Sequence, residues 1–370
     1  MIRILHVVHS MDCGGTENII MNLYRNINRE DIQFDFLVHT NKECFFDGEI
    51  EELGGKIYRV SHYKMYNLLR YRKELHALFS QHKEWIAVHG HLGSCACVYL
   101  TIANKYGLYT IAHSHAINEK QINLVNLLYQ FHAYLSRGVA DFYMACSLEA
   151  GIDRYGRKIV KSNNFKIIKN GIKAINYIYN PKVREDLRQL LHLKDKYVVG
   201  HVGRFCAVKN HGFMINILVE LKKISNEYCL ICVGDGELRK SFEQKAKELG
   251  VDASVILTGI RKDIPNILQA MDCFIFPSFN EGLGIALIEA QAAGLPCIAN
   301  KDGIIPLAKI TDLVEFISLK EGAAAWAQQI HRVCQAKIQR KNMINSVITS
   351  GFDIDDVVSW ISNFYLNLKK

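Results

Sequence analysis

The sequence lacks a strong excess of charge of either sign. Its formal net charge is +8 over 370 residues, and basic residues are spread along the chain. This small, dispersed excess of positive charge suits an anionic ligand or an anionic membrane surface. It does not predict nucleic-acid binding, for which no sequence motif is present either. A Walker A loop is also missing, which argues against a kinase or an ATPase.

Signals for export or for spanning a membrane are also missing. The apolar start is interrupted by Arg3, His6 and His9, so we expect no signal peptide. The longest uncharged run, Trp85 to Asn104, contains histidine and glycine, which favours a strand, a turn and a helix over a membrane span. The cysteines number 11 and show no disulfide-framework spacing. We therefore expect a cytoplasmic protein with reduced cysteines.

What is present is an alternation of apolar, strand-like runs with longer helical segments. Hydrophobic residues make up 49% of the chain, enough for two α/β domains with parallel sheets. The expected strands are Ile2–Val8, Ile32–His39, Lys56–Val60, Ile86–His89, Tyr109–His113, Phe142–Cys146, Phe165–Ile168, Tyr197–Val202, Tyr228–Val233, Val255–Thr258, Cys273–Phe276 and Pro296–Ala299.

The charged stretch from Asn180 to Lys196 has no strand character and marks the expected domain boundary. We expect a first domain over residues 1–180 and a second over 181–350. The terminal segment, residues 351–370, contains an amphipathic helical pattern from Ile354 to Leu368. In sheets of this kind, ligands bind outside the carboxyl ends of the strands, so residues just after each expected strand are the candidates for a site.

Two carboxylates in residues 277–296 bracket a glycine-containing loop between an expected strand and an expected helix. Glu281 and Glu289 are the carboxylates, and the loop between them begins with Gly282, Leu283, Gly284 and Ile285. Glycine permits close backbone approach, and the N–H groups and dipole of a helix start attract an anion such as a diphosphate. The alternative is an ordinary strand–loop–helix joint with two solvated glutamates.

Two further loops follow expected strands. Arg204 and Lys209 come after Tyr197–Val202, and both cations can turn towards one diphosphate, although surface solvation is the usual fate of such residues. Gly14 and Gly15 come after the first strand and precede a helix, another arrangement that suits an anion. Glycine pairs are also common in turns.

Two histidine pairs end neighbouring expected strands. They are His89 with His91 and His113 with His115. Four histidines suggest a zinc site, but neither pair is joined by an acidic or thiol ligand at metal-site spacing. We therefore expect no metal.

These motifs together resemble those of the family 4 glycosyltransferases, retaining enzymes of the GT-B fold that use nucleotide sugars. Residues 281–289, Glu-Gly-Leu-Gly-Ile-Ala-Leu-Ile-Glu, resemble the E-x7-E motif of that family. Residues 203–210 are similar to its G-R-x(4)-K-N pattern, and residues 14–17 to its G-G-x-E loop. The capsule and exopolysaccharide branch is the most similar.

The resemblance implies a GT-B fold, with two Rossmann-like domains facing each other across a cleft and a C-terminal helix that returns to the first. It also implies roles for particular residues. Arg204 and Lys209 would hold the donor diphosphate, Glu289 the ribose, and Glu281 the donor sugar. His113, with His115 as the alternative, would contact the sugar or stabilise developing charge. Backbone groups around Ile260 would pair with the base.

The implied function is retaining transfer of a sugar from a nucleotide diphosphate donor, a UDP-sugar by family habit, to a lipid-linked or growing glycan. No cofactor is expected beyond the donor. The alternatives are a UDP-sugar epimerase or a phosphorylase of similar fold, or a non-catalytic subunit that binds sugar nucleotides.

A last hypothesis concerns the membrane. The segment from Gln121 to Arg137 is broadly apolar and is followed by a basic run: Arg154, Arg157, Lys158, Lys161, Lys166 and Lys169. Most such helices bury their apolar face in the core. The alternative is that this surface rests on the anionic inner face of the cell membrane and meets a lipid-linked acceptor.

Overall fold

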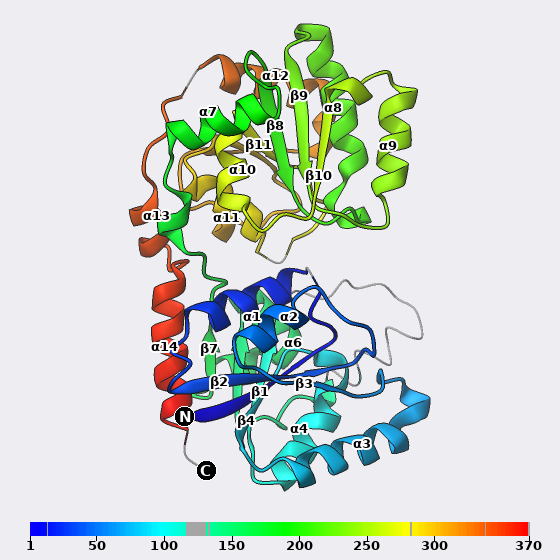
Figure 1. Cartoon of the computed structure of the whole chain (residues 1–370), viewed down its shortest axis with the longest axis vertical. Helices are drawn as coiled ribbons and strands as arrows, with labels where there is room; N and C mark the ends of the chain where they lie inside the picture. Colours follow the sequence, from blue (N-terminus) through cyan, green and yellow to red (C-terminus); the bar gives the residue numbers. More distant parts are fainter. Residues whose placement is uncertain (13, 116–130, 132–133, 282, 337, 369–370) are drawn as a thin grey trace. The chain divides into compact units, whose positions relative to one another are not determined.

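The computed structural model describes residues 1–12, 14–115, 131, 134–281, 283–336 and 338–368 (Figure 1). It divides into two compact units. The first comprises Met1–Gly171 together with Ile354–Lys370, and the second comprises Ile172–Asp353. Each unit contains a parallel sheet with helices, which confirms the predicted α/β class. Among the described residues, no helix combines the length and the apolar character needed to cross a bilayer.

The first unit is built on a seven-stranded parallel sheet with the order β3-β2-β1-β4-β5-β6-β7. Its strands are β1 (Ile2–Val8), β2 (Ile32–Val38), β3 (Ile57–Arg59), β4 (Trp85–Gly90), β5 (Tyr109–Ser114), β6 (Phe142–Ala145) and β7 (Phe165–Ile167). Every residue of β2 is buried. Burial on both faces explains why these strands are almost continuously apolar in sequence.

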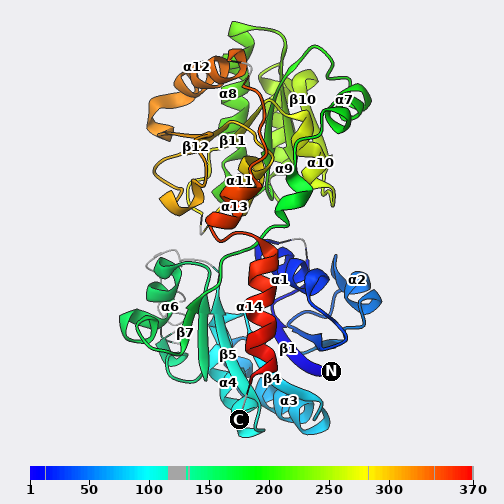
Figure 2. The same cartoon turned by 90° about the vertical axis from the view of Figure 1, so that its left-hand side faces the viewer.

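Helices cover both faces of this sheet (Figures 1 and 2). They are α1 (Gly15–Asn26), α2 (Asp47–Glu52), α3 (Leu68–Gln81), α4 (Ala96–Lys105), α6 (Leu148–Val160) and α14 (Ile354–Leu366). Although α14 comes from the far end of the chain, it packs against α1 and β2 of the first unit. Its buried residues Ile361 and Tyr365 belong to the same hydrophobic cluster as Phe34. Burying such side chains is worth roughly 1.5–3 kcal/mol each.

One buried carboxylate is held in the core of the first unit. Asp35 on β2 has no exposed surface. It accepts hydrogen bonds from Arg3 Nε at 2.8 Å and Nη2 at 2.6 Å, from Trp85 Nε1 at 2.8 Å and from the backbone N–H of Lys56 at 2.9 Å. A buried charge is tolerated only when it is paired and hydrogen-bonded, as here.

The second unit has a six-stranded parallel sheet with the order β10-β9-β8-β11-β12-β13. Its strands are β8 (Tyr197–Val202), β9 (Tyr228–Val233), β10 (Val255–Gly259), β11 (Cys273–Phe276), β12 (Cys297–Asn300) and β13 (Val314–Ile317). Its helices are α7 (Pro181–Leu190), α8 (His211–Ile224), α9 (Arg239–Glu248), α10 (Ile264–Ala270), α11 (Ile285–Ala292), α12 (Gly322–Gln335) and α13 (Ile344–Thr349).

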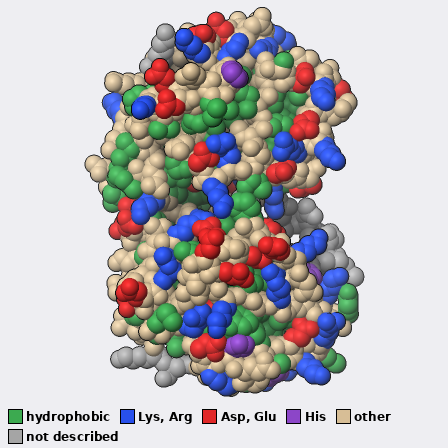
Figure 3. All heavy atoms as spheres, viewed as in Figure 1, with side chains coloured by type: hydrophobic (Ala, Val, Ile, Leu, Met, Phe, Trp, Pro, Cys, Tyr) green, Lys and Arg blue, Asp and Glu red, His purple; other side chains and the backbone are tan. Residues whose placement is uncertain are grey.

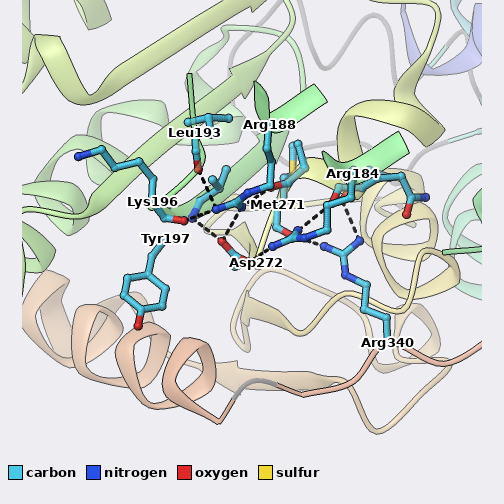
Figure 4. Close-up of polar contacts among 12 residues, drawn as sticks. Arg184, Arg188, Leu193, Lys196, Tyr197, Met271, Asp272 and Arg340 are labelled. Atoms are coloured by element: carbon cyan, nitrogen blue, oxygen red, sulfur yellow. Dashed lines mark hydrogen bonds and ion pairs between the residues drawn. The ribbon is translucent and has the colours of Figure 1, made fainter. Parts of the chain in front are cut away.

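The charged stretch from Asn180 to Lys196 lies inside this second unit and contains α7. Its cations cap the end of α10 (Figure 4). Arg184 Nη1 donates to the carbonyls of Gln269 and Met271, each at 2.8 Å, and Arg188 Nη1 donates to the carbonyl of Ala270 at 2.9 Å. These are carbonyls that a helix end leaves without partners.

Asp272 and Arg340 complete the cluster in Figure 4. Asp272 accepts from Arg184 Nη2 at 2.5 Å and from Arg188 Nη1 at 3.0 Å. Arg340 donates to the carbonyls of Leu268 and Met271. Burial, followed by the neighbouring Arg184, lowers the pKa of Arg340 to about 9. The cluster joins α7 and the segment after α12 to the start of β11.

Candidate functional site

In the second unit, the predicted diphosphate residues follow two neighbouring strands. β8 is the first strand of this sheet in sequence, and it pairs with β9 on one side and with β11 on the other. The strand order therefore reverses between β8 and β11, and loops at the carboxyl ends of such a strand pair form a ligand-binding crevice. Arg204 and Lys209 follow β8, whereas Glu281 and Glu289 follow β11.

The structure brings Lys209 and Glu281 into direct contact. Lys209 ends a short 3-10 turn, Ala207–Lys209, and its Nζ lies 2.5 Å from Glu281 Oε1. The exposed fractions of the two side chains are 20% and 13%, so water screens this pair only in part. Lys209 Nζ also lies 5.1 Å from the centre of the Phe276 ring, a cation–π contact. The loop after β11 is fixed by the Glu281 N–H, which donates to the Gly303 carbonyl at 3.0 Å.

The loop after β11 leads into the N-terminus of α11. Gly284 precedes the helix with φ 71° and ψ 55°, a left-handed conformation that favours glycine. A Cβ atom there would also lie 2.9 Å from the Phe276 ring. Leu283 is buried and Ile285 begins the helix. The first turn of a helix presents N–H groups without intrahelical partners, which suits an anion. Gly282 lies outside the described residues.

Glu289 is about one turn into α11 and is partly buried. Its Oε1 accepts a hydrogen bond from the Tyr177 hydroxyl at 2.6 Å. Burial raises the pKa of Glu289 to about 7, although the Tyr177 hydrogen bond opposes the shift. The carboxyl group can therefore change charge near neutral pH when a ligand or a neighbouring group changes its surroundings.

The remaining predicted residues of the second unit lie at the same edge of the sheet. Arg204 is exposed, and among the described residues no hydrogen-bond or ion-pair partner is found for its side chain. The next residue, Phe205, donates its N–H to the carbonyl of Asp235 in the loop after β9, at 3.0 Å. Ile260 follows β10 and is 45% exposed. Packing between adjacent loops thus holds the backbone beside Arg204 while leaving its guanidinium accessible.

Gly14 and Gly15 lie at the start of α1, after β1 of the first unit. The Gly14 carbonyl accepts from the backbone N–H of Asn18 at 3.0 Å and from its side-chain amide at 2.7 Å. A Cβ at Gly14 would meet only the flexible end of Glu17, and one at Gly15 would meet nothing within 4 Å. Open space at Gly15 is compatible with close approach of a ligand.

His113 lies near the carboxyl end of β5 and is connected to the C-terminal helix. Its Nδ1 is 3.1 Å from His89 Nε2 on β4, and His89 Nδ1 is 2.5 Å from the Tyr365 hydroxyl on α14. Burial lowers the pKa of both histidines well below the usual value, so both are neutral at pH 7. His113 also lines a cavity of about 150 Å³ in the first unit, together with Thr16, His115 and Arg154.

A second histidine chain runs beside the first. His6 Nδ1 on β1 is 3.0 Å from His91 Nε2, and His91 Nδ1 is 2.7 Å from His115 Nε2. Burial lowers the pKa of His6 to about 3 and that of His115 to about 4. Both histidine pairs found in the sequence are therefore neutral and extensively hydrogen-bonded.

Ring nitrogens of these histidines also lie at distances that a metal ion could bridge. In the trio His6, His89 and His91, and in the trio His91, His113 and His115, the candidate ligand atoms are within 4.8 Å of one another. Neutral imidazole is the ligand form that zinc requires. The histidines already form hydrogen bonds with one another and with Tyr365, so most of their ring nitrogens have partners without an ion. Our expectation of no metal stays a prediction.

Several residues of these sites were not singled out from the sequence. Tyr177 and Tyr365 are separated by 112 and 276 residues from their partners Glu289 and His89. No local pattern signals such pairings. A larger cavity, about 680 Å³, lies elsewhere in the second unit and is lined by residues such as Lys309 and Asp312. None of the predicted residues lines this cavity.

The chain is similar to known glycosyltransferases. Residues 182–349 match the family model "Glycosyl transferases group 1". The chain is 29% identical over 370 residues to the Bacillus subtilis protein EpsF, whose name describes it as a glycosyltransferase, with 98% of this chain and 96% of EpsF covered. It is 24% identical to CapH of Staphylococcus aureus, a capsular polysaccharide biosynthesis glycosyltransferase, with 99% of each chain covered.

A solved structure supports the fold over the full length. Anabaena HepE, determined in complex with UDP and glucose, superposes with a TM-score of 0.80 at 19% identity and covers 100% of both chains. At that identity the likeness shows the fold alone. The chain therefore has the GT-B fold, contains a glycosyl transferases group 1 domain over residues 182–349, and is similar over its whole length to glycosyltransferases of capsule and polysaccharide biosynthesis.

Proposed function

We propose that the chain transfers a sugar, with retention of configuration, from a UDP-sugar to a lipid-linked or growing glycan in capsule or exopolysaccharide synthesis. The observation that carries the proposal is the meeting of Lys209 and Glu281 beside the first turn of α11, at the strand reversal of the second unit. A diphosphate placed there would face a cation and a helix N-terminus.

The leaving diphosphate is the group that most needs stabilisation in this reaction. Lys209 supplies a compact charge that is already held by Glu281 and Phe276. Arg204 supplies an exposed planar guanidinium whose fork matches phosphate oxygens. Such groups stabilise charge that develops on the leaving oxygen without having to reorganise during the reaction. The proposed mechanism needs no metal.

The two glutamates serve different parts of the donor in this proposal. Glu289 accepts hydrogen bonds from ribose hydroxyls, for which its Tyr177-bound carboxyl group is already oriented. Glu281 contacts the donor sugar once the diphosphate draws Lys209 away. His113 contacts the transferred sugar, and the backbone at Ile260 pairs with the base. UDP is favoured as the nucleotide because UDP occupies the similar HepE structure.

A panel of nucleotide sugars tests the donor. The purified chain is incubated with each UDP-sugar, and release of UDP is measured, first with water and then with lipid-linked acceptors. We expect one UDP-sugar to be used and the anomeric configuration of the product to match that of the donor. Inversion, or use of a purine-nucleotide sugar only, would contradict the proposal.

A pair of lysine variants tests the site. Lys209→Ala should lower the transfer rate by about 10²–10³, the usual effect of removing a group that stabilises transition-state charge. The control, Lys223→Ala, removes an exposed lysine of α8 that pairs with Glu220 and should leave the rate unchanged. Equal activity of the two variants would refute the assignment of Lys209.

The acceptor side gives a separate hypothesis of peripheral binding at the inner face of the cell membrane. On α6, Arg157 and Lys158 are exposed, and Leu148 at its start is 45% exposed. The apolar segment Gln121–Arg137, predicted to share this surface, lies mostly outside the described residues. On the face shown in Figure 3, Lys and Arg are interspersed with Asp and Glu, so membrane attraction would depend on local groups such as these.

Sedimentation with anionic vesicles tests this hypothesis. We expect binding to phosphatidylglycerol vesicles at low salt, loss of binding at high salt, and weaker binding of the double variant Arg157→Glu/Lys158→Glu. Absence of wild-type binding at low salt would exclude the membrane hypothesis. The double variant should transfer sugar to a soluble acceptor at the wild-type rate.

A further inference from the structure

A buried hydrogen-bond chain begins at the C-terminal helix and ends at the histidine predicted to meet the sugar. It contains Tyr365, His89 and His113, joined by contacts of 2.5 Å and 3.1 Å. Tyr365 has no exposed surface, His89 is 1% exposed and His113 is 6% exposed. Water cannot readily replace any of these partners, so the position of each proton is set by the chain itself.

The Tyr365 end decides the direction of the chain. Burial raises the pKa of Tyr365 well above its usual value, so the phenol keeps its proton. Among the described residues, His89 Nδ1 is the hydrogen-bond partner found for this hydroxyl. If the hydroxyl accepted from His89 instead, its own buried proton would have no acceptor, which costs roughly 1–3 kcal/mol. Tyr365 therefore donates, and His89 Nδ1 accepts.

The same reasoning passes along the two rings. A neutral imidazole carries one proton, so His89 with an accepting Nδ1 must be protonated at Nε2. His89 Nε2 then donates to His113 Nδ1, and His113 must carry its proton on Nε2. His113 Nε2 is buried and has no partner in the described part of the chain. This N–H also lacks an acceptor, but His113 lines the cavity of about 150 Å³, where a ligand oxygen can accept from it. The Tyr365 hydroxyl lies instead in a hydrophobic cluster, so an orphaned proton costs more at the Tyr365 end.

We propose that Tyr365 and His89 are positioning residues that hold His113 as the neutral Nε2–H tautomer, so that it donates a hydrogen bond to an oxygen of the bound sugar. The second histidine chain, His6–His91–His115, has no such hydroxyl at its end and both of its terminal nitrogens lack partners in the described structure. Its direction is therefore not fixed in the same way. This difference singles out His113 over His115 as the sugar donor.

The inference rests on the proposed function for its kinetic part but not for its structural part. Selective ¹⁵N labelling of histidine reports directly which ring nitrogen carries the proton, whether or not the chain transfers sugar. The ring-nitrogen signals of His113 are identified as those that disappear in the His113→Gln variant. We expect a protonated Nε2 and an unprotonated Nδ1 in the wild-type chain. Finding the proton on Nδ1 would overturn the proposal without any need for a variant.

Tyr365→Phe removes the directing hydroxyl and keeps the ring. We expect a mixture of His113 tautomers and a fall in kcat of about tenfold to a hundredfold, the effect seen when the hydrogen-bond partner of a metal-ligating histidine is lost, taken here by analogy. KM for the donor should change far less than kcat, since the nucleotide is held elsewhere. An unchanged tautomer in Tyr365→Phe would show that the chain does not direct His113.

Tyr24→Phe is the matched control. Its buried hydroxyl has Gln33 Oε1 at 2.7 Å and the Leu53 carbonyl at 3.1 Å as acceptors for its one proton, away from the histidines. The Tyr24→Phe variant should lose about as much free energy of unfolding as Tyr365→Phe does, but it should keep the His113 tautomer and the wild-type kcat. An equal loss of kcat in both variants would show that Tyr365 has only a structural role. The predicted tautomer in a chain that uses no nucleotide sugar would instead contradict the proposed function and the sugar contact, and would leave only the direction of the hydrogen-bond chain standing.

Discussion

The raised pKa of Glu289 leads to a prediction about stability. Burial raises the pKa of its carboxyl from 4.5 to about 7 in the folded chain. The folded state thus binds this proton more tightly than the unfolded state does. The stabilisation linked to the proton is fully present below pH 4.5 and is lost as pH rises through about 7.

The size of the effect follows from the shift. One pKa unit corresponds to about 1.4 kcal/mol, so the ionised Glu289 should destabilise the folded state by up to about 3 kcal/mol above pH 7. Glu289→Gln keeps the shape and an oxygen that can accept from Tyr177 but cannot ionise. The variant should therefore gain little relative to wild type at pH 5 and become more stable than wild type, by up to that amount, at pH 8.

The measurement is hydrogen exchange of peptides from α11 as a function of urea at pH 5, 6, 7 and 8, which follows the unit that contains the mutation. Glu243→Gln is the control, because Glu243 is a partly exposed carboxylate on α9 paired with Arg239, and its effect should be small at every pH. A stability difference between Glu289→Gln and wild type that does not grow with pH would refute the reasoning.

Other perturbations test the pairings seen in the structure. Glu281→Ala frees Lys209 from its 2.5 Å partner, so by titration calorimetry UDP should bind at least as tightly as to wild type while transfer is lost; weaker binding would contradict this. Lys209→Ala should bind UDP about 10–100-fold more weakly, as expected for a charge-assisted contact, and unchanged affinity would count against a diphosphate there. Asp35→Ala leaves Arg3 without its buried partner and should lower the free energy of unfolding by about 3–5 kcal/mol; a loss below about 1 kcal/mol would show that the pair is dispensable. EDTA should leave donor hydrolysis unchanged, and loss of activity that zinc restores would reveal a metal among the histidines.

Much of the fold could be predicted because each strand is a compact apolar run that ends at a turn residue. β1, β8, β9 and β11 begin and end where the sequence indicates. β13 was missed because it is a four-residue edge strand with only one fully buried residue, Val314. Its apolar signal is therefore short and weak.

α7 was missed for a different reason. None of its residues is fully buried, and its many charges led the stretch to be interpreted as a linker, although Val183, Leu187 and Leu190 recur at helical spacing. The capping pattern was present all the same: Asn180 accepts hydrogen bonds from the N–H groups of Lys182 and Val183, and Pro181 follows it. Such a cap predicts a helix start without reference to the core.

The sequence could indicate which loops follow strand ends, but it could not show what their side chains contact. The candidate residues lie after strand ends, as predicted, and the strand order then shows that β8 neighbours β11 and that β4 neighbours β5. The contacts of Lys209 with Glu281 and of Glu289 with Tyr177 depend on tertiary packing between segments far apart in the chain. The histidine chain that ends at Tyr365 likewise depends on the docking of α14 onto the first unit.

A crystal structure of the chain with UDP would test the central claim most directly. We predict that the diphosphate contacts Lys209, Arg204 and the first turn of α11, with the ribose against Glu289 and the Lys209–Glu281 contact broken. UDP bound anywhere else, or bound with the Lys209–Glu281 pair intact, would contradict this assignment.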